Sequence, residues 1–254
     1  MAPRYAAGAP IDAARYRSAI DVTADEARSG LTDQHRWYLE AYGYLCFRGL
    51  LIDDLPQIAT AFDELVADPD VPRIEWLPPG HHGHPQWMLG DVVPRHPTLA
   101  ALPTDARILG LVHDLLGSDA TYIGSDASVY ACETDWHCDT PAVDRDLRHL
   151  KFAIYLDPIR QAHGAPRLLV GSHQLDIAAG GPLHRYLGYD GAVEERTGVH
   201  SRDLPHWALP SDPGDVLVWD FRVMHATFGT TEPRRQITLN YRATRPEAVG
   251  GIAT

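Results

Sequence analysis

Hydrophobic and polar residues follow different patterns in the two halves of the chain. In the first half, hydrophobic residues recur every three to four positions, which is typical of helices that pack on a core. Thr32 and Gly43 have the chemistry of helix-capping residues, and Gly117 ends a third such segment. The pattern predicts helices at residues 32–43, 53–66 and 102–117, with a short strand at 44–48.

After Gly117, short runs rich in β-branched and aromatic residues alternate with turn signals. The predicted strands are 121–124, 128–132, 150–156, 167–170, 215–220 and 235–241. Helices followed by many strands favour an α+β fold with a mainly β core, in which N-terminal helices brace an antiparallel double-sheet roll. Outside these elements we expect an N-terminal arm at 1–30, a loop at 69–97 and a lid-like insert at 174–212.

Composition narrows the class of protein. A chain of 254 residues with 44% hydrophobic residues can form one full core, and we expect a single domain over 1–254. The formal net charge of −12 argues against nucleic acid or an anionic membrane as a partner. The three cysteines imply no disulfide framework, and no run of 18 apolar residues occurs. We therefore expect a cytoplasmic protein without a nucleic-acid or membrane partner, with its oligomeric state open.

Candidate metal ligands occur in the segment DWHCD, which contains His137 and Asp139, and in VMHATFG, which contains His225. Side chains at i and i+2 of a strand point the same way, so His137 and Asp139 can converge on one ion. Two imidazoles and one carboxylate suit Fe(II) and leave positions open for a cosubstrate and dioxygen. His225 lies far downstream, so a folded scaffold must bring it to the pair, and His173 is a competing histidine.

The order of motifs in the second half resembles the phytanoyl-CoA dioxygenase-like family of Fe(II)/2-oxoglutarate oxygenases. The motifs are WHCD, KFAIYLDP, GSH, PGD, MHATFG and RRQITLNYR, and the segment LTDQHRWYLEAYGYLCFRGLL resembles the family's helix–glycine–strand opening. The resemblance implies a double-stranded β-helix (jelly roll) with the metal inside one end. His137, Asp139 and His225 match the ligand positions of the family, and His173 matches a position outside the ligand set.

The cosubstrate implied by this resemblance, 2-oxoglutarate, has a distal carboxylate that requires a charged partner, and arginine suits this role best. Arg234 and Arg235 lie at the start of the last strand, where only one of them can face the interior. The family pattern selects Arg234 and matches Thr227 to a hydroxyl that helps to bind the same carboxylate. Lys151 and Tyr130 are weaker candidates, because a snorkelling lysine and a tyrosine at the core edge are the favoured interpretations.

The resemblance implies hydroxylation or a related oxidation of a C–H bond, with succinate and carbon dioxide as coproducts. Aspartate at position 139 argues against halogenation, because related radical halogenases carry a small residue there. The acidic sequence shows no obvious basic cluster for the phosphates of a CoA thioester, so we expect a small, polar or natural-product-like substrate. Two alternatives stay open: a zinc hydrolase with the same ligand types, and a non-catalytic jelly-roll binding protein.

Overall fold

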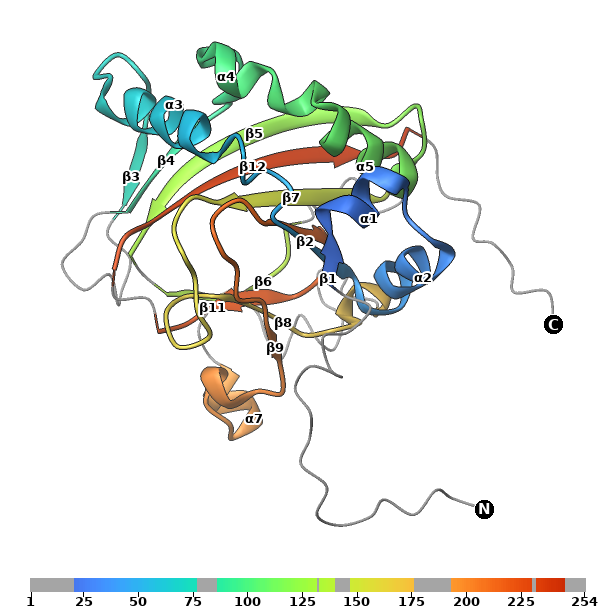
Figure 1. The fold of residues 1–254 in the computed structure, drawn as a ribbon. Coiled ribbons are helices and arrows are strands. Elements are labelled where there is room, and N and C mark those ends of the chain that lie inside the picture. Colours follow the sequence, from blue (N-terminus) through green and yellow to red (C-terminus); the bar gives the residue numbers. More distant parts are fainter. Residues whose placement is uncertain are drawn as a thin grey trace, which may run out of the picture.

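Two β-sheets face each other in the computed structural model, which describes residues 21–76, 86–131, 133–139, 147–175, 193–229 and 232–244 (Figure 1). The large sheet has the order β1 (Asp21–Thr23), β2 (Tyr44–Arg48), β10 (Val216–Asp220), β7 (His149–Tyr155), β12 (Arg234–Arg242), β5 (Thr121–Tyr130), β4 (Gln86–Gly90), β3 (Ile74–Trp76). The small sheet has the order β6 (Thr134–His137), β11 (His225–Thr227), β8 (Pro166–Leu168), β9 (Trp207–Ala208). Strand β1 pairs with β2 in parallel, and the central strands pair antiparallel.

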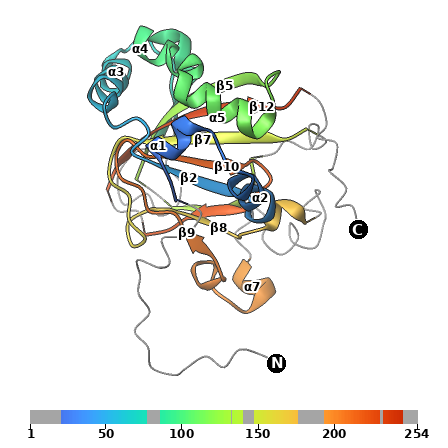
Figure 2. The same cartoon turned by 45° about the vertical axis from the view of Figure 1, so that its right-hand side comes forward.

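Helices cover the outer face of the large sheet (Figures 1 and 2). They are α1 (Ala24–Ser29), α3 (Leu55–Ala67), α4 (Pro97–Ala100) and α5 (Ala106–Leu116), with 3₁₀ turns η2 (Val93–Arg95) and η3 (Leu102–Thr104) between them. Helix α2 (Asp33–Tyr42) contacts the turn η4 (Ser172–Gln174) at one end of the molecule. Helix α7 (Val193–Thr197) and the turn η5 (Ser201–Asp203) precede β9, and α7 lies beyond the small sheet in both views.

Strand β12 shows how the sequence divides the large sheet into two faces. Alternate residues Ile237, Leu239 and Tyr241 are buried in the apolar cluster that includes Phe62 and Phe152. The residues between them are polar and lie on the opposite face, toward the small sheet. The helices therefore close an apolar core on one side of the large sheet. The space between the sheets receives the polar side chains of β12 and also a second, smaller apolar cluster that includes Leu168, Leu209 and Leu217.

The end of helix α2 explains one glycine that the fold requires. Thr32 caps the start of the helix by accepting a hydrogen bond from the His35 backbone N–H, and Gly43 ends the helix in the left-handed conformation at φ 86°. A Cβ atom at position 43 would lie 2.5 Å from Val223 Cγ2 and 2.7 Å from His173 Nδ1. Only glycine allows the chain to turn this closely against the segment that leads into β11.

The expected α+β jelly roll with a mainly β core is confirmed, and so are the three helices and the strand at 44–48. Four expectations were wrong in part. Residues 21–29 of the expected arm form β1 and α1, because Val22 is buried and Thr23 caps the helix. The expected loop at 69–97 contributes the edge strands β3 and β4, and the strands expected at 121–124 and 128–132 form one strand, β5.

The insert expected at 174–212 also ends earlier than predicted, because Trp207 and Ala208 join the small sheet as β9. Residues 1–20, 77–85 and 176–192 lie outside the described residues, and the expectations that fall on them are untested. The single domain over 1–254 likewise stays a prediction.

Within the described residues, none of the helices combines the length and the apolar composition that crossing a membrane requires.

Candidate metal centre

Two neighbouring strands of the small sheet bring the histidines together. His137 ends β6 and lies directly opposite His225, the first residue of β11, and the centroids of their rings are 4.2 Å apart. Asp139 follows two residues after His137, and its backbone N–H donates a 2.8 Å hydrogen bond to the Phe221 carbonyl. The predicted convergence of these three residues therefore exists in the fold, at one end of the space between the sheets.

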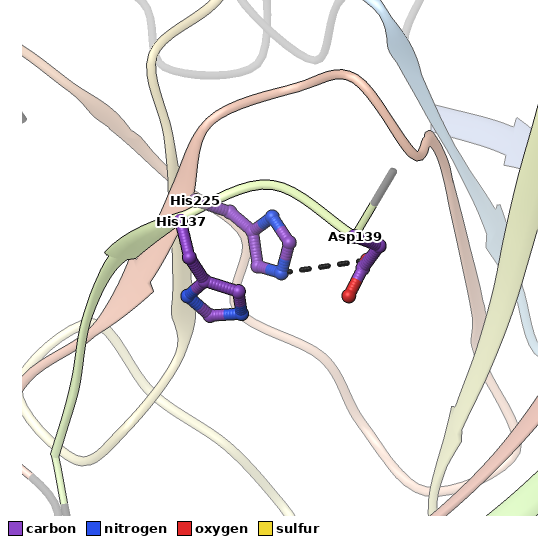
Figure 3. A group of neighbouring side chains, drawn as sticks. All are labelled: His137, Asp139 and His225. Carbon is purple, nitrogen blue, oxygen red and sulfur yellow. Dashed lines mark ion pairs between the residues drawn. The ribbon is translucent and has the colours of Figure 1, made fainter. Parts of the chain in front are cut away.

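The candidate ligand atoms lie close enough together to hold one divalent ion. One nitrogen from each ring and one oxygen of Asp139 all lie within 4.8 Å of one another (Figure 3). His137 Nδ1 lies 2.8 Å from the Asp135 carbonyl and His225 Nδ1 lies 2.9 Å from the Val223 carbonyl. Each contact assigns the proton to Nδ1 and directs the Nε2 lone pair to ligation, as a metal site needs. Two imidazoles and a carboxylate fit iron, and by donor type they also fit zinc.

The electrostatic environment keeps His225 and Asp139 in the protonation states that bind metal. Burial and the nearby His137 lower the pKa of His225 to about 3, so its ring is neutral at physiological pH. Burial alone would raise the pKa of Asp139, but Lys151, His225 and His137 hold it below its ordinary value. An ionised carboxylate beside a neutral imidazole is the state that a divalent cation binds.

Lys151 lies next to Asp139. Its Nζ atom is 2.8 Å from Asp139 Oδ1, and each side chain is 16% exposed. Burial opposes the charge of Lys151, but Asp139 and Asp126 hold its pKa above the ordinary value. The lysine does not snorkel to the surface as sequence reasoning favoured, because its ammonium group is paired with a candidate metal ligand.

The two adjacent arginines of β12 face opposite ways. Arg235 faces the helices, where its guanidinium binds Asp157 at 2.7 Å and Asp63 at 2.9 Å. Arg234 is 5% exposed and faces the space between the sheets, with Cζ 5.7 Å from the Tyr130 ring centroid. Of the pair, Arg234 is therefore the residue that can meet a ligand between the sheets.

The other candidates occupy distinct places. Thr227 is buried on β11, two residues from His225 and on the same face by alternation. Tyr130 is opposite Arg234 on β5, and burial raises its pKa to about 12. His173 lies outside the cluster in η4, where its Nε2 is 2.8 Å from the Glu40 carbonyl.

Sequence reasoning missed two aromatic residues of the site. Trp219 Nε1 donates a 3.4 Å hydrogen bond to Asp139 Oδ2, and Tyr155 is hydrogen-bonded to Arg234. Both could have been found by alternation, because Tyr155 is four residues from Lys151 on β7 and Trp219 is two residues from the inward-facing Leu217 on β10.

A jelly roll with a two-histidine, one-carboxylate cluster at one end is typical of metal-dependent oxygenases. The family model described as phytanoyl-CoA dioxygenase (PhyH) matches residues 39–237, and this chain belongs to that family. No curated protein sequence matches the chain.

Several solved structures share the fold. The epimerase SnoN from nogalamycin biosynthesis superposes with a TM-score of 0.65 at 21% identity, covering 82% of each chain. EctD from S. alaskensis has a TM-score of 0.65 at 20% identity over 84% of this chain and 77% of its own. HygX from Streptomyces hygroscopicus, solved with nickel and 2-oxoglutarate, has a TM-score of 0.64 at 16% identity, covering 85% and 88%. At these identities, the likeness shows the fold.

Proposed function

We propose that this chain is an Fe(II)- and 2-oxoglutarate-dependent dioxygenase that hydroxylates a C–H bond of a small, polar or natural-product-like molecule. The observation that carries the proposal is the convergence of His137, Asp139 and His225, with ligand atoms within 4.8 Å of one another. Membership of the PhyH family supports it. Iron and 2-oxoglutarate also agree with the groups bound to SnoN, namely Fe³⁺ and α-ketoglutarate, and with the 2-oxoglutarate bound to HygX.

The three ligand residues hold the metal on one side. His137 and His225 would bind the metal through Nε2 and Asp139 would bind it through its carboxylate, and three protein ligands would leave room for a 2-oxo acid and dioxygen. When bound, iron and 2-oxoglutarate would supply the oxidation of a substrate C–H bond by dioxygen, with succinate and carbon dioxide as coproducts. Trp136 precedes His137 on β6, is fully buried and packs its ring against Phe228. This packing holds the strand that carries His137.

Arg234 binds the distal carboxylate of 2-oxoglutarate through its guanidinium fork. Its inward orientation, its burial and the contacts with Tyr130 and Tyr155 support this role, because two aromatic side chains restrict the fork to one orientation. Thr227 lies on the same face as His225 and adds a hydroxyl donor. We assign no such role to Arg235, because its fork is already engaged with Asp157 and Asp63.

The substrate proposal rests on charge and on the polar interior. A chain of net charge −12 is a poor receptor for the phosphates of a CoA thioester. The face of β12 toward the small sheet is polar, which suits a substrate with hydroxyl or amino groups. A SnoN structure contains nogalamycin RO and a HygX structure contains hygromycin B, and both agree with a natural-product-like substrate.

Anaerobic addition of Fe(II) and 2-oxoglutarate tests the proposal directly. We expect a metal-to-ligand charge-transfer absorption band in the unaltered protein and its loss in His137→Ala, because the variant lacks one of three metal ligands. A substrate panel scored by oxygen-dependent succinate release then identifies the compound, and a product heavier by one oxygen atom would establish hydroxylation. An unchanged band in His137→Ala would exclude this ligand set.

The zinc hydrolase remains the second candidate, because the same three side chains can bind Zn²⁺. It leaves the inward-facing Arg234 without a role. Zinc-supported turnover in the absence of oxygen would favour the hydrolase and overturn the oxygenase proposal.

A further inference from the structure

Lys151 is the only lysine among 254 residues, whereas the chain contains 21 arginines. A chain that uses arginine at almost every basic position places its one lysine beside Asp139. Lysine and arginine differ at such a place, because ammonium is a compact point charge and guanidinium is a planar fork with donors for two oxygens. The position therefore suits a cation that engages one carboxylate oxygen and leaves the other available.

The surrounding strands hold Lys151 firmly. It lies on β7, between β10 and β12, opposite Trp219 on one side and Asn240 on the other. Its Nζ atom lies 5.8 Å from the Trp219 ring centroid and 5.6 Å from that of Phe221. Aromatic faces attract a cation at these distances, so the ammonium group has a defined position.

The two oxygens of Asp139 have different neighbours. Oδ1 lies 2.8 Å from Lys151 Nζ. Oδ2 lies 3.6 Å from His225 Nε2 and accepts the 3.4 Å hydrogen bond from Trp219 Nε1. The oxygen that faces the histidine is thus separate from the oxygen that faces the lysine.

We propose that Lys151 is a positioning residue that restricts Asp139 to metal ligation through Oδ2 alone. If both oxygens bound the metal, the carboxylate would occupy a position that a chelating cosubstrate or dioxygen needs. An ammonium group fixed on Oδ1 prevents this without taking a metal position itself. The inference rests on the proposed metal site and replaces the expected contact of Lys151 with the cosubstrate.

Cobalt(II) without cosubstrate provides a test, because its visible absorption reports the number of metal ligands. We expect Lys151→Met to bind Co(II) as tightly as the unaltered protein or up to about tenfold more tightly, because a repelling charge is removed. Its spectrum should differ, because Asp139 gains a second contact with the metal. We expect Lys151→Arg to bind Co(II) at least about tenfold more weakly, because the fork engages both carboxylate oxygens.

Arg160→Met is the matched control, because it removes one positive charge from an exposed pair with Asp212. We expect its Co(II) spectrum and affinity to equal those of the unaltered protein. An unaltered Co(II) spectrum in Lys151→Met would overturn the inference. If that variant also bound 2-oxoglutarate poorly, the two results together would indicate that Lys151 contacts the cosubstrate and does not position Asp139. Failure of the unaltered protein to bind Co(II) would instead remove the proposed metal site itself.

The single lysine allows a second measurement on the unaltered protein, which does not depend on the folding of a variant. An amine-reactive reagent can label only Lys151 and the N-terminus, and peptide mass mapping separates the two. We expect Lys151 to stay protected from labelling after Co(II) is added, because its ammonium group remains paired with Asp139 Oδ1. Faster labelling in the presence of Co(II) would mean that the metal displaces the lysine, and the inference would be wrong.

Discussion

The two faces of the large sheet use the same strands for opposite purposes. On β7, Phe152 and Ile154 face the helices and lie in the apolar cluster, whereas Lys151 and Tyr155 face the candidate site. The helix face gains stability from burial of a large apolar surface. The site face has a smaller apolar cluster and also carries buried charges whose desolvation opposes folding. Adjacent residues of one strand should therefore respond differently to substitution. Substitutions on the helix face should change stability, and substitutions on the site face should change ligand binding.

The largest expected effect is on the helix face. Phe152 is fully buried and its ring contacts Tyr241 at 5.2 Å between centroids. We expect Phe152→Ala to lower the free energy of unfolding by about 3–5 kcal/mol, because a large cavity remains. Urea unfolding measures the loss. Ile123→Ala, at a 40% exposed position on β5, is the control and should change stability by less than about 0.5 kcal/mol.

Phe152→Ala also tests whether the two faces are separable. The fraction of the variant that remains folded should bind Co(II) with the affinity of the unaltered protein. Loss of binding in a folded variant would show that the site depends on packing across the sheet.

A substitution on the site face should instead weaken ligand binding and leave stability unchanged or higher. We expect Arg234→Met to raise the KM for 2-oxoglutarate about 10- to 100-fold, because a charged hydrogen-bonded contact is lost. The free energy of unfolding should stay the same or rise, because a buried charge is removed. Steady-state kinetics and urea unfolding of one preparation measure both quantities. An unchanged KM would exclude Arg234 as the carboxylate partner.

A smaller effect concerns the pH dependence of stability without metal. The pKa of His225 is about 3 in the folded chain, against an ordinary value of 6.5. Between these values the unfolded chain binds a proton that the folded chain does not, so stability falls as the pH decreases. We expect His225→Asn to lose about 2 kcal/mol less than the unaltered protein between pH 6.5 and pH 4.5. Equal losses, measured by urea unfolding at each pH, would contradict the burial of a neutral ring.

Much of this division could be predicted from the sequence, because it depends on alternation. The segment RRQITLNYR places apolar and polar residues on opposite faces. The spacing of His137 and Asp139 predicts their convergence, although Asp139 lies beyond the end of β6. The edge strands β3 and β4 were missed because they lie in a segment rich in proline, glycine and histidine. The pair of Lys151 with Asp139 was missed because it depends on how β7 lies against the segment after β6, which no local pattern contains.

The smallest expected effect separates the two arginines of β12. Arg235 is on the helix face, where it joins Asp157 and Asp63 in a partly exposed network. We expect Arg235→Met to lower the free energy of unfolding by about 1 kcal/mol or less, because solvent weakens such pairs. The KM for 2-oxoglutarate should not change, in contrast to Arg234→Met. If Arg235→Met raised this KM as strongly as Arg234→Met, the orientation of the side chain on the strand would not decide which arginine binds the cosubstrate. The distinction between the two faces would then fail for two adjacent residues that face opposite ways.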